Sequence, residues 1–117
     1  MSVQCNTYVL IGTSFPYDTF SEDDMYEKLE PFMDNPFKGI HHHNGICILS
    51  DGMNGEYFIV GRVLAKSANH DGLVAPLVVR MTDAERSEVK YDIKHALGSL
   101  VTLPDFDVTP IVVSHYR

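Results

Sequence analysis

The chain has 117 residues, 44% of them hydrophobic and 21% charged, which is the length of one domain and the composition of a globular protein. Its 16 acidic and 9 basic residues give a net charge of −7, which disfavours sequence-independent binding to nucleic-acid backbones. No apolar run reaches the roughly 18 residues of a membrane span, and the first residues lack the features of a secretory signal. We therefore expect a single-domain cytoplasmic protein over residues 1–117, with no membrane association.

The acidic charge is concentrated near the start of the chain. Residues 1–40 carry seven acids and two bases, residues 41–80 carry three of each, and residues 81–117 carry six acids and four bases. This asymmetry is typical of a solvated acidic face or of a surface that meets a basic partner. The two cysteines, Cys5 and Cys47, form no CxxC motif, and we expect reduced thiols in the core.

The first third of the chain predicts a strand followed by a helix. Apolar residues alternate over residues 3–11, which predicts a strand, and residues 12–18 are expected to form a loop. Ser21 and Asp24 then have the spacing of a capping box, and Pro31 is expected to end or kink the helix near Glu30. The apolar stripe of this helix consists of Met25, Leu29, Phe32 and Met33.

The middle of the chain predicts a hairpin and one further strand. Residues 46–50 and 56–65 are predicted to be strands, and they flank a loop with two turn signals, Asp51-Gly52 and Asn54-Gly55. Residues 73–81 can form another strand, which Pro76 restricts to an edge or a bulge.

The last third predicts a helix and a closing strand. Thr82 and Glu85 form a second capping box, Gly98 is placed to end the helix, and residues 108–115 are expected to form the last strand. The expected order is β-α-β-β-(β)-α-β, an α+β domain with a mostly antiparallel sheet of four or five strands and two helices. This order resembles the split βαβ, or ferredoxin-like, pattern.

The histidines give one hypothesis for chemistry. Six occur in the chain, three of them consecutive, and an extended backbone would place His41 and His43 on one side, where they could chelate one metal ion. His70 and His115 are candidates for further ligands, with Asp71 as an alternative. The competing interpretation is a polar loop that precedes a buried strand, and we expect no cofactor.

A metal-free acid–base site is a related hypothesis. Histidine titrates near neutral pH, and His115 could act together with Tyr57 or Tyr116. The simpler expectation is that His115, close to the end of the sequence, is only exposed. No GxSxG, GxGxxG or GxxxxGK[ST] motif occurs, which disfavours a serine hydrolase and a nucleotide phosphate loop.

The first predicted helix carries an acidic ridge on the face opposite its apolar stripe. Asp23, Glu27 and Glu30 follow one another at helical spacing, and Tyr26 lies beside them. Like charges at this spacing cost a few tenths of a kcal/mol each, so the ridge is either tolerated or used to contact a basic surface. We select these four residues as the candidate partner-binding surface.

Part of the N-terminal third resembles the opening of small uncharacterised proteins from tailed bacteriophages. The segments that carry the resemblance are Tyr8-Val9-Leu10-Ile11, Leu29-Glu30-Pro31-Phe32 and Asn35-Pro36. The resemblance implies a protein of the infected bacterial cytoplasm that binds a host component. It implies no catalytic residue.

The leading hypothesis is a small acidic binding protein without enzymatic activity, which binds or inhibits a host protein or another copy of itself through its acidic face. One alternative is a small metal- or histidine-dependent hydrolase that uses the histidine cluster. Another is a structural or assembly protein that forms homodimers or larger homo-oligomers through edge strands at 73–81 or 108–115.

Overall fold

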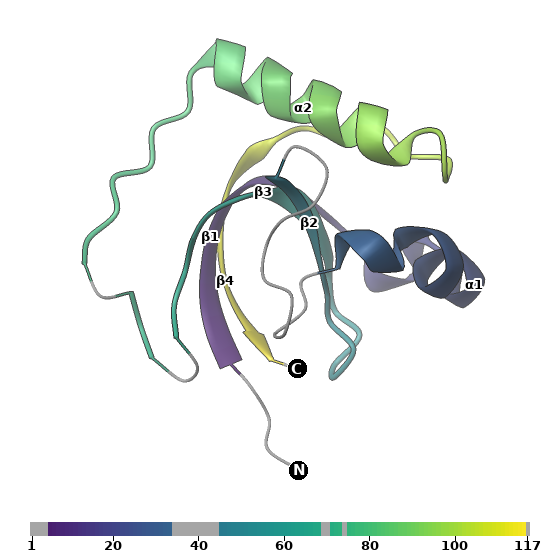
Figure 1. Cartoon of the computed structure of the whole chain (residues 1–117), viewed down its shortest axis with the longest axis horizontal. Coiled ribbons are helices and arrows are strands. Elements are labelled where there is room, and N and C mark those ends of the chain that lie inside the picture. Colours follow the sequence, from purple (N-terminus) through teal and green to yellow (C-terminus); the bar gives the residue numbers. More distant parts are fainter. Residues whose placement is uncertain (1–4, 34–44, 69–70, 74, 117) are drawn as a thin grey trace.

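The computed structural model describes residues 5–33, 45–68, 71–73 and 75–116, and these residues form an α+β domain (Figure 1). The strands are β1 (Cys5–Phe15), β2 (Ile46–Ser50), β3 (Phe58–Lys66) and β4 (Thr109–Tyr116). The helical elements are η1 (Tyr17–Thr19), α1 (Glu22–Asp24), η2 (Met25–Leu29), η3 (Glu30–Phe32) and α2 (Asp83–Leu97). None of the helices in this part of the chain is long and apolar enough to cross a membrane.

The four strands form one antiparallel sheet in the order β2-β3-β1-β4. The central pair is β3 and β1, so the two strands joined through the first helical segment, β1 and β2, are separated by β3. This order confirms the predicted split βαβ arrangement.

One predicted strand was wrong. Within residues 71–73 and 75–81 the structure has no strand, and Leu77 and Val78 are exposed. Pro76 has no amide hydrogen for a ladder, which favours an irregular backbone there. The sheet therefore has four strands among the described residues, which is the lower of the two predicted numbers.

The first strand is longer than the sequence predicted. Residues 12–15 extend β1 instead of forming a loop, with Gly12 opposite Gly61 of β3 and Thr109 of β4. A Cβ atom on Gly12 would lie 2.1 Å from the carbonyl oxygen of Val60, and one on Gly61 would lie 2.5 Å from that of Ile11. The strands approach so closely here that only glycine fits.

The sheet is strongly curved and forms an arch in Figure 1. Two features account for the curvature. The register between β1 and β3 shifts between Val9 and Leu10, which is the mark of a β-bulge, and the Gly12–Gly61 pair lies farther along the same two strands. Bulges and glycines bend strands because they interrupt the regular ladder and its side-chain packing.

Two hydrophobic clusters occupy the two faces of the sheet. The larger one joins both helical segments to strand residues such as Ile11, Phe15 and Val60. The smaller one contains strand residues only, with Tyr8 and Leu10 at its centre. Successive strand residues point to opposite faces, which explains why Leu10 and Ile11 belong to different clusters.

Both predicted helix starts are confirmed. The amide of Asp24 donates to Ser21 Oγ at 3.1 Å, and the amide of Glu85 donates to Thr82 Oγ1 at 3.1 Å. These bonds satisfy amide groups that the first turn of a helix leaves without a helical partner. The buried residues of α2 are Val89, Ile93 and Leu97.

Candidate functional site

The first helical segment changes geometry along its length. It begins as α1, continues as the π-helical turn η2 and ends as the 3₁₀ turn η3. Pro31 explains the change, because it has no amide hydrogen to donate to the carbonyl four residues earlier and disfavours a regular α-helix before it. π-Helical turns are rare and occur often at functional sites.

The acidic ridge lies on the outside of this segment. Met25, Leu29 and Phe32 are buried, whereas the four residues selected from the sequence are all exposed: Asp23, Tyr26, Glu27 and Glu30. Tyr26 retains 71% of its accessible surface, a large value for an aromatic side chain. The structure therefore places the ridge where a partner can reach it.

The charge of the segment is strongly negative. Residues 22–32 contain five acids and a single base, Lys28, which is a net charge of −4. Lys28 Nζ lies 3.1 Å from Asp24 Oδ1, an ion pair between side chains one turn apart. The excess charge is thus carried by Glu22 together with the three acids of the ridge.

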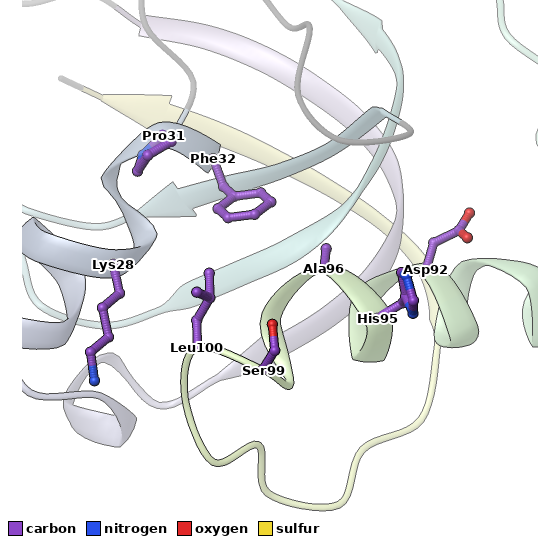
Figure 2. Close-up of a pocket in the computed structure, with 8 residues that line it drawn as sticks. All are labelled: Lys28, Pro31, Phe32, Asp92, His95, Ala96, Ser99 and Leu100. Atoms are coloured by element: carbon purple, nitrogen blue, oxygen red, sulfur yellow. The ribbon is translucent and has the colours of Figure 1, made fainter.

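A pocket of about 520 Å³ opens between this segment and the C-terminal part of α2 (Figure 2). Pro31 and Phe32 lie on one side of it, and Ala96 and Leu100 lie on the other. The remaining lining residues are Lys28, Asp92, His95 and Ser99. The volume is within the range of sites that hold a small ligand or a large side chain.

Asp92, at one edge of the pocket, is held by Arg62 of β3. Arg62 Nη2 bonds to Asp92 Oδ2, and Arg62 Nη1 lies 3.3 Å from Glu88 Oε1. These contacts link the sheet to α2. They also turn the carboxylate of Asp92 away from the centre of the pocket, as Figure 2 shows.

His95 is oriented by an aromatic neighbour. Its ring stacks on that of Tyr91, with centroids 5.6 Å apart and an angle of 11° between the planes. Tyr91 is 64% exposed. The exposed face next to the pocket therefore has aromatic as well as acidic character.

His115 was expected to be exposed, and this was wrong, since only 4% of its surface is accessible. Its Nδ1 lies 2.7 Å from the hydroxyl of Tyr57, the pairing considered for an acid–base site. Its ring also packs edge-on against those of Tyr57 and Tyr8. His115 is buried because the curved sheet brings the hairpin that carries Tyr57 over the end of β4.

The phenol of Tyr57 stays protonated well above neutral pH. Burial and the nearby charges of Asp51, Cys5 and Glu56 raise its pKa to about 12. Each of these effects disfavours the phenolate. When the phenol donates to His115 Nδ1, the neutral imidazole carries its proton on Nε2.

The metal hypothesis finds no support in the described residues. His41, His43 and His70 lie outside them, and His115 is packed against tyrosine side chains. Within the described ranges no three histidine, cysteine or acidic side chains are close enough together to hold a metal ion. Cys5 and Cys47 lie on strands that are not neighbours. Cys47 is buried as expected, whereas Cys5 is only partly buried, so its expected place in the core was wrong.

Sequence reasoning missed the pocket. A usable signal was Arg62, the one charged residue within residues 57–65, because a cation among apolar strand residues needs a carboxylate partner. No comparable signal marked Ser99 or His95. The chain matches no protein-family model, and comparisons with curated proteins and with solved structures gave no match.

Proposed function

We propose that this protein is a small acidic binding protein without enzymatic activity, whose helical face contacts a basic protein partner. The observation that carries the proposal is the pocket between η3 and α2, two of whose lining residues directly follow acids of the exposed ridge in the chain. Protein interfaces commonly combine a recess for an anchor side chain with a polar rim. Lys28 and Pro31 line the pocket, and Glu27 and Glu30 are their neighbours in the chain.

The partner class follows from the charge. A surface with a net charge of −4 over one short segment attracts a basic partner and repels nucleic acid. The resemblance of the N-terminal third to small phage proteins favours a protein of the bacterial cytoplasm as that partner. Binding to such a host protein would make this chain an inhibitor or an adaptor.

The test is a pull-down from bacterial lysate with three tagged baits. The first is the wild type, the second is D23K/E27K/E30K, and the third is D71K/D105K/D107K. Both triple variants change the net charge from −7 to −1, because each replacement of an acid by lysine adds two charges. The three control positions are exposed and lie outside the acidic ridge.

We expect the wild type and the control variant to retain one partner at near-stoichiometric recovery, and the ridge variant to lose it. Loss of the partner by both variants would show a general charge effect. Retention by both would exclude the ridge as the binding surface. Circular dichroism of the three baits establishes that each is folded.

A further inference from the structure

The pocket has apolar walls, and the charged residues that line it are paired with opposite charges. Pro31, Phe32, Ala96 and Leu100 form its apolar walls. Its two fully charged lining groups are each paired with a charge of opposite sign, Lys28 with Asp24 and Asp92 with Arg62. An ion brought into this pocket would lose its hydration and gain no unpaired counter-charge, so the pocket favours a neutral, apolar group.

Apart from the paired Lys28 and Asp92, the polar residues that line the pocket are His95 and Ser99. Ser99 directs its hydroxyl toward the pocket in Figure 2, and the ring of His95 is held by its stack on Tyr91. A large aromatic side chain with one hydrogen-bonding atom fits this combination, because its ring contacts the apolar walls and its polar atom can reach the hydroxyl.

The charge of the acidic ridge indicates which kind of protein segment would present that aromatic side chain. Glu27 and Glu30, which directly precede the lining residues Lys28 and Pro31 in the chain, belong to the acidic ridge, whose charge complements lysine and arginine. A neutral anchor in the pocket and positive charges around it are complementary to the two parts of this surface.

We propose that the pocket is the anchor site for a basic protein segment that inserts one large aromatic side chain between η3 and α2. This inference rests on the proposed function and specifies the chemistry of its partner. The anchor supplies buried apolar contact, and the flanking cations supply orientation and a faster encounter with the acidic ridge.

The absence of tryptophan from this chain permits a direct test. The probe is a synthetic lysine–alanine peptide with one central tryptophan, whose fluorescence is then the only tryptophan signal in the sample. The comparison probe is the same peptide with glutamate in place of lysine. We expect a saturable blue shift of the emission with the basic peptide at submillimolar concentration, and none with the acidic peptide.

Two matched substitutions distinguish binding in the pocket from binding elsewhere on the helical face. Ser99→Phe fills the pocket, and Ser87→Phe places the same side chain at another exposed serine, within this helix, which does not line the pocket. We expect Ser99→Phe to weaken binding about tenfold or more and Ser87→Phe to leave it unchanged. Leu100→Lys, which replaces an apolar wall with a cation, should act like Ser99→Phe, and thermal unfolding establishes that each variant is folded.

Each other outcome overturns the inference. Equal binding of the acidic peptide would mean that the occupant does not have to be basic. Unchanged affinity of Ser99→Phe for the basic peptide would mean that the pocket is not the anchor site. Lack of saturable binding of that peptide at millimolar concentration would lead to the same conclusion. The proposed function fails separately, through retention of the lysate partner by D23K/E27K/E30K, so the two failures are distinguishable.

Discussion

The hydroxyl of Tyr57 lies 2.7 Å from Nδ1 of His115, although the two residues belong to opposite ends of the sheet. Tyr57 directly precedes Phe58, which pairs with Phe15 at one end of β1, whereas His115 pairs with Asn6 near the other end. The nine residue steps from Asn6 to Phe15 would span about 30 Å in a straight strand. The bond therefore closes the curved sheet across its inner face.

Loss of this bond should destabilise the domain. Tyr57→Phe removes the hydroxyl and leaves the nitrogen of the buried His115 without this bond, which we expect to cost about 1–3 kcal/mol of unfolding free energy. Urea denaturation at neutral pH measures the change. Tyr91→Phe is the control, since its ring is 64% exposed and its hydroxyl can bond to water in either state. Equal stability of the two variants would show that the Tyr57–His115 bond contributes nothing.

The raised pKa of Tyr57 predicts a loss of stability at high pH. The pKa is about 12 in the folded protein against 10.0 for the unperturbed side chain, so between these values the folded state binds more protons than the unfolded state. The unfolding free energy should therefore decrease as the pH rises from about 10 to about 12 and be unaffected by this group below that window.

Ultraviolet titration of tyrosinate tests the same shift. The chain has six tyrosines, and the pKa of Tyr116 is also raised, by its hydrogen bond with Cys5. We expect the titration of Tyr57→Phe to lack one late-ionising group that the wild type shows. A titration in which Tyr57→Phe removes a group with an ordinary pKa would contradict the assignment.

The glycine pair in the centre of the sheet should tolerate no side chain. Gly12→Ala places a Cβ 2.1 Å from the carbonyl oxygen of Val60, a backbone atom that cannot rotate away, and we expect a loss of at least about 1–3 kcal/mol. Gly52→Ala is the control, because no heavy atom outside its chain neighbours lies within 4 Å of the position that the new methyl group would take. We expect that control to change stability by about 0.5 kcal/mol or less. Chemical denaturation of both variants measures the unfolding free energy. An unchanged value for Gly12→Ala would contradict the close approach of β1 and β3 at this position.

Arg62 should stabilise the contact between sheet and helix mainly through Asp92. The side chains of Arg62 and Asp92 are 27% and 13% exposed, so Asp92→Asn should cost about 1.5–3 kcal/mol, the range of hydrogen bonds to charged groups. Glu88→Gln, at a carboxylate that is 63% exposed, should cost less than about 1 kcal/mol because solvent screens that pair. Denaturation curves of the two variants measure the difference, and an equal cost would contradict the assignment.

The assembly hypothesis predicts contact between copies at β4, an edge strand of the sheet. Val112 is 69% exposed on this strand, so it is available to a second chain. If copies pair there, Val112→Lys should lower the apparent mass measured by light scattering at high concentration. A wild type that is already monomeric under those conditions would exclude the hypothesis.

The sequence by itself determined the features that depend on near neighbours. Ser21 and Thr82 cap the two helical segments because the amides they accept from are three residues away. Apolar periodicity identified Met25, Leu29 and Phe32 as buried residues of the first helical segment. The exposed acidic ridge follows from the same helical spacing. Local periodicity and short-range hydrogen bonds are properties of a few consecutive residues, so they can be recognised without the fold.

Only the tertiary structure decided the features that join distant segments. Gly12 extends β1 because it faces Gly61, and His115 is buried because the curvature of the sheet brings Tyr57 to it. The pocket lies where η3 and the end of α2 come together, and Asp92 at its edge is held by an ion pair with Arg62. These arrangements depend on strand order, register and curvature, which result from the packing of the whole chain rather than from the spacing of residues within one element.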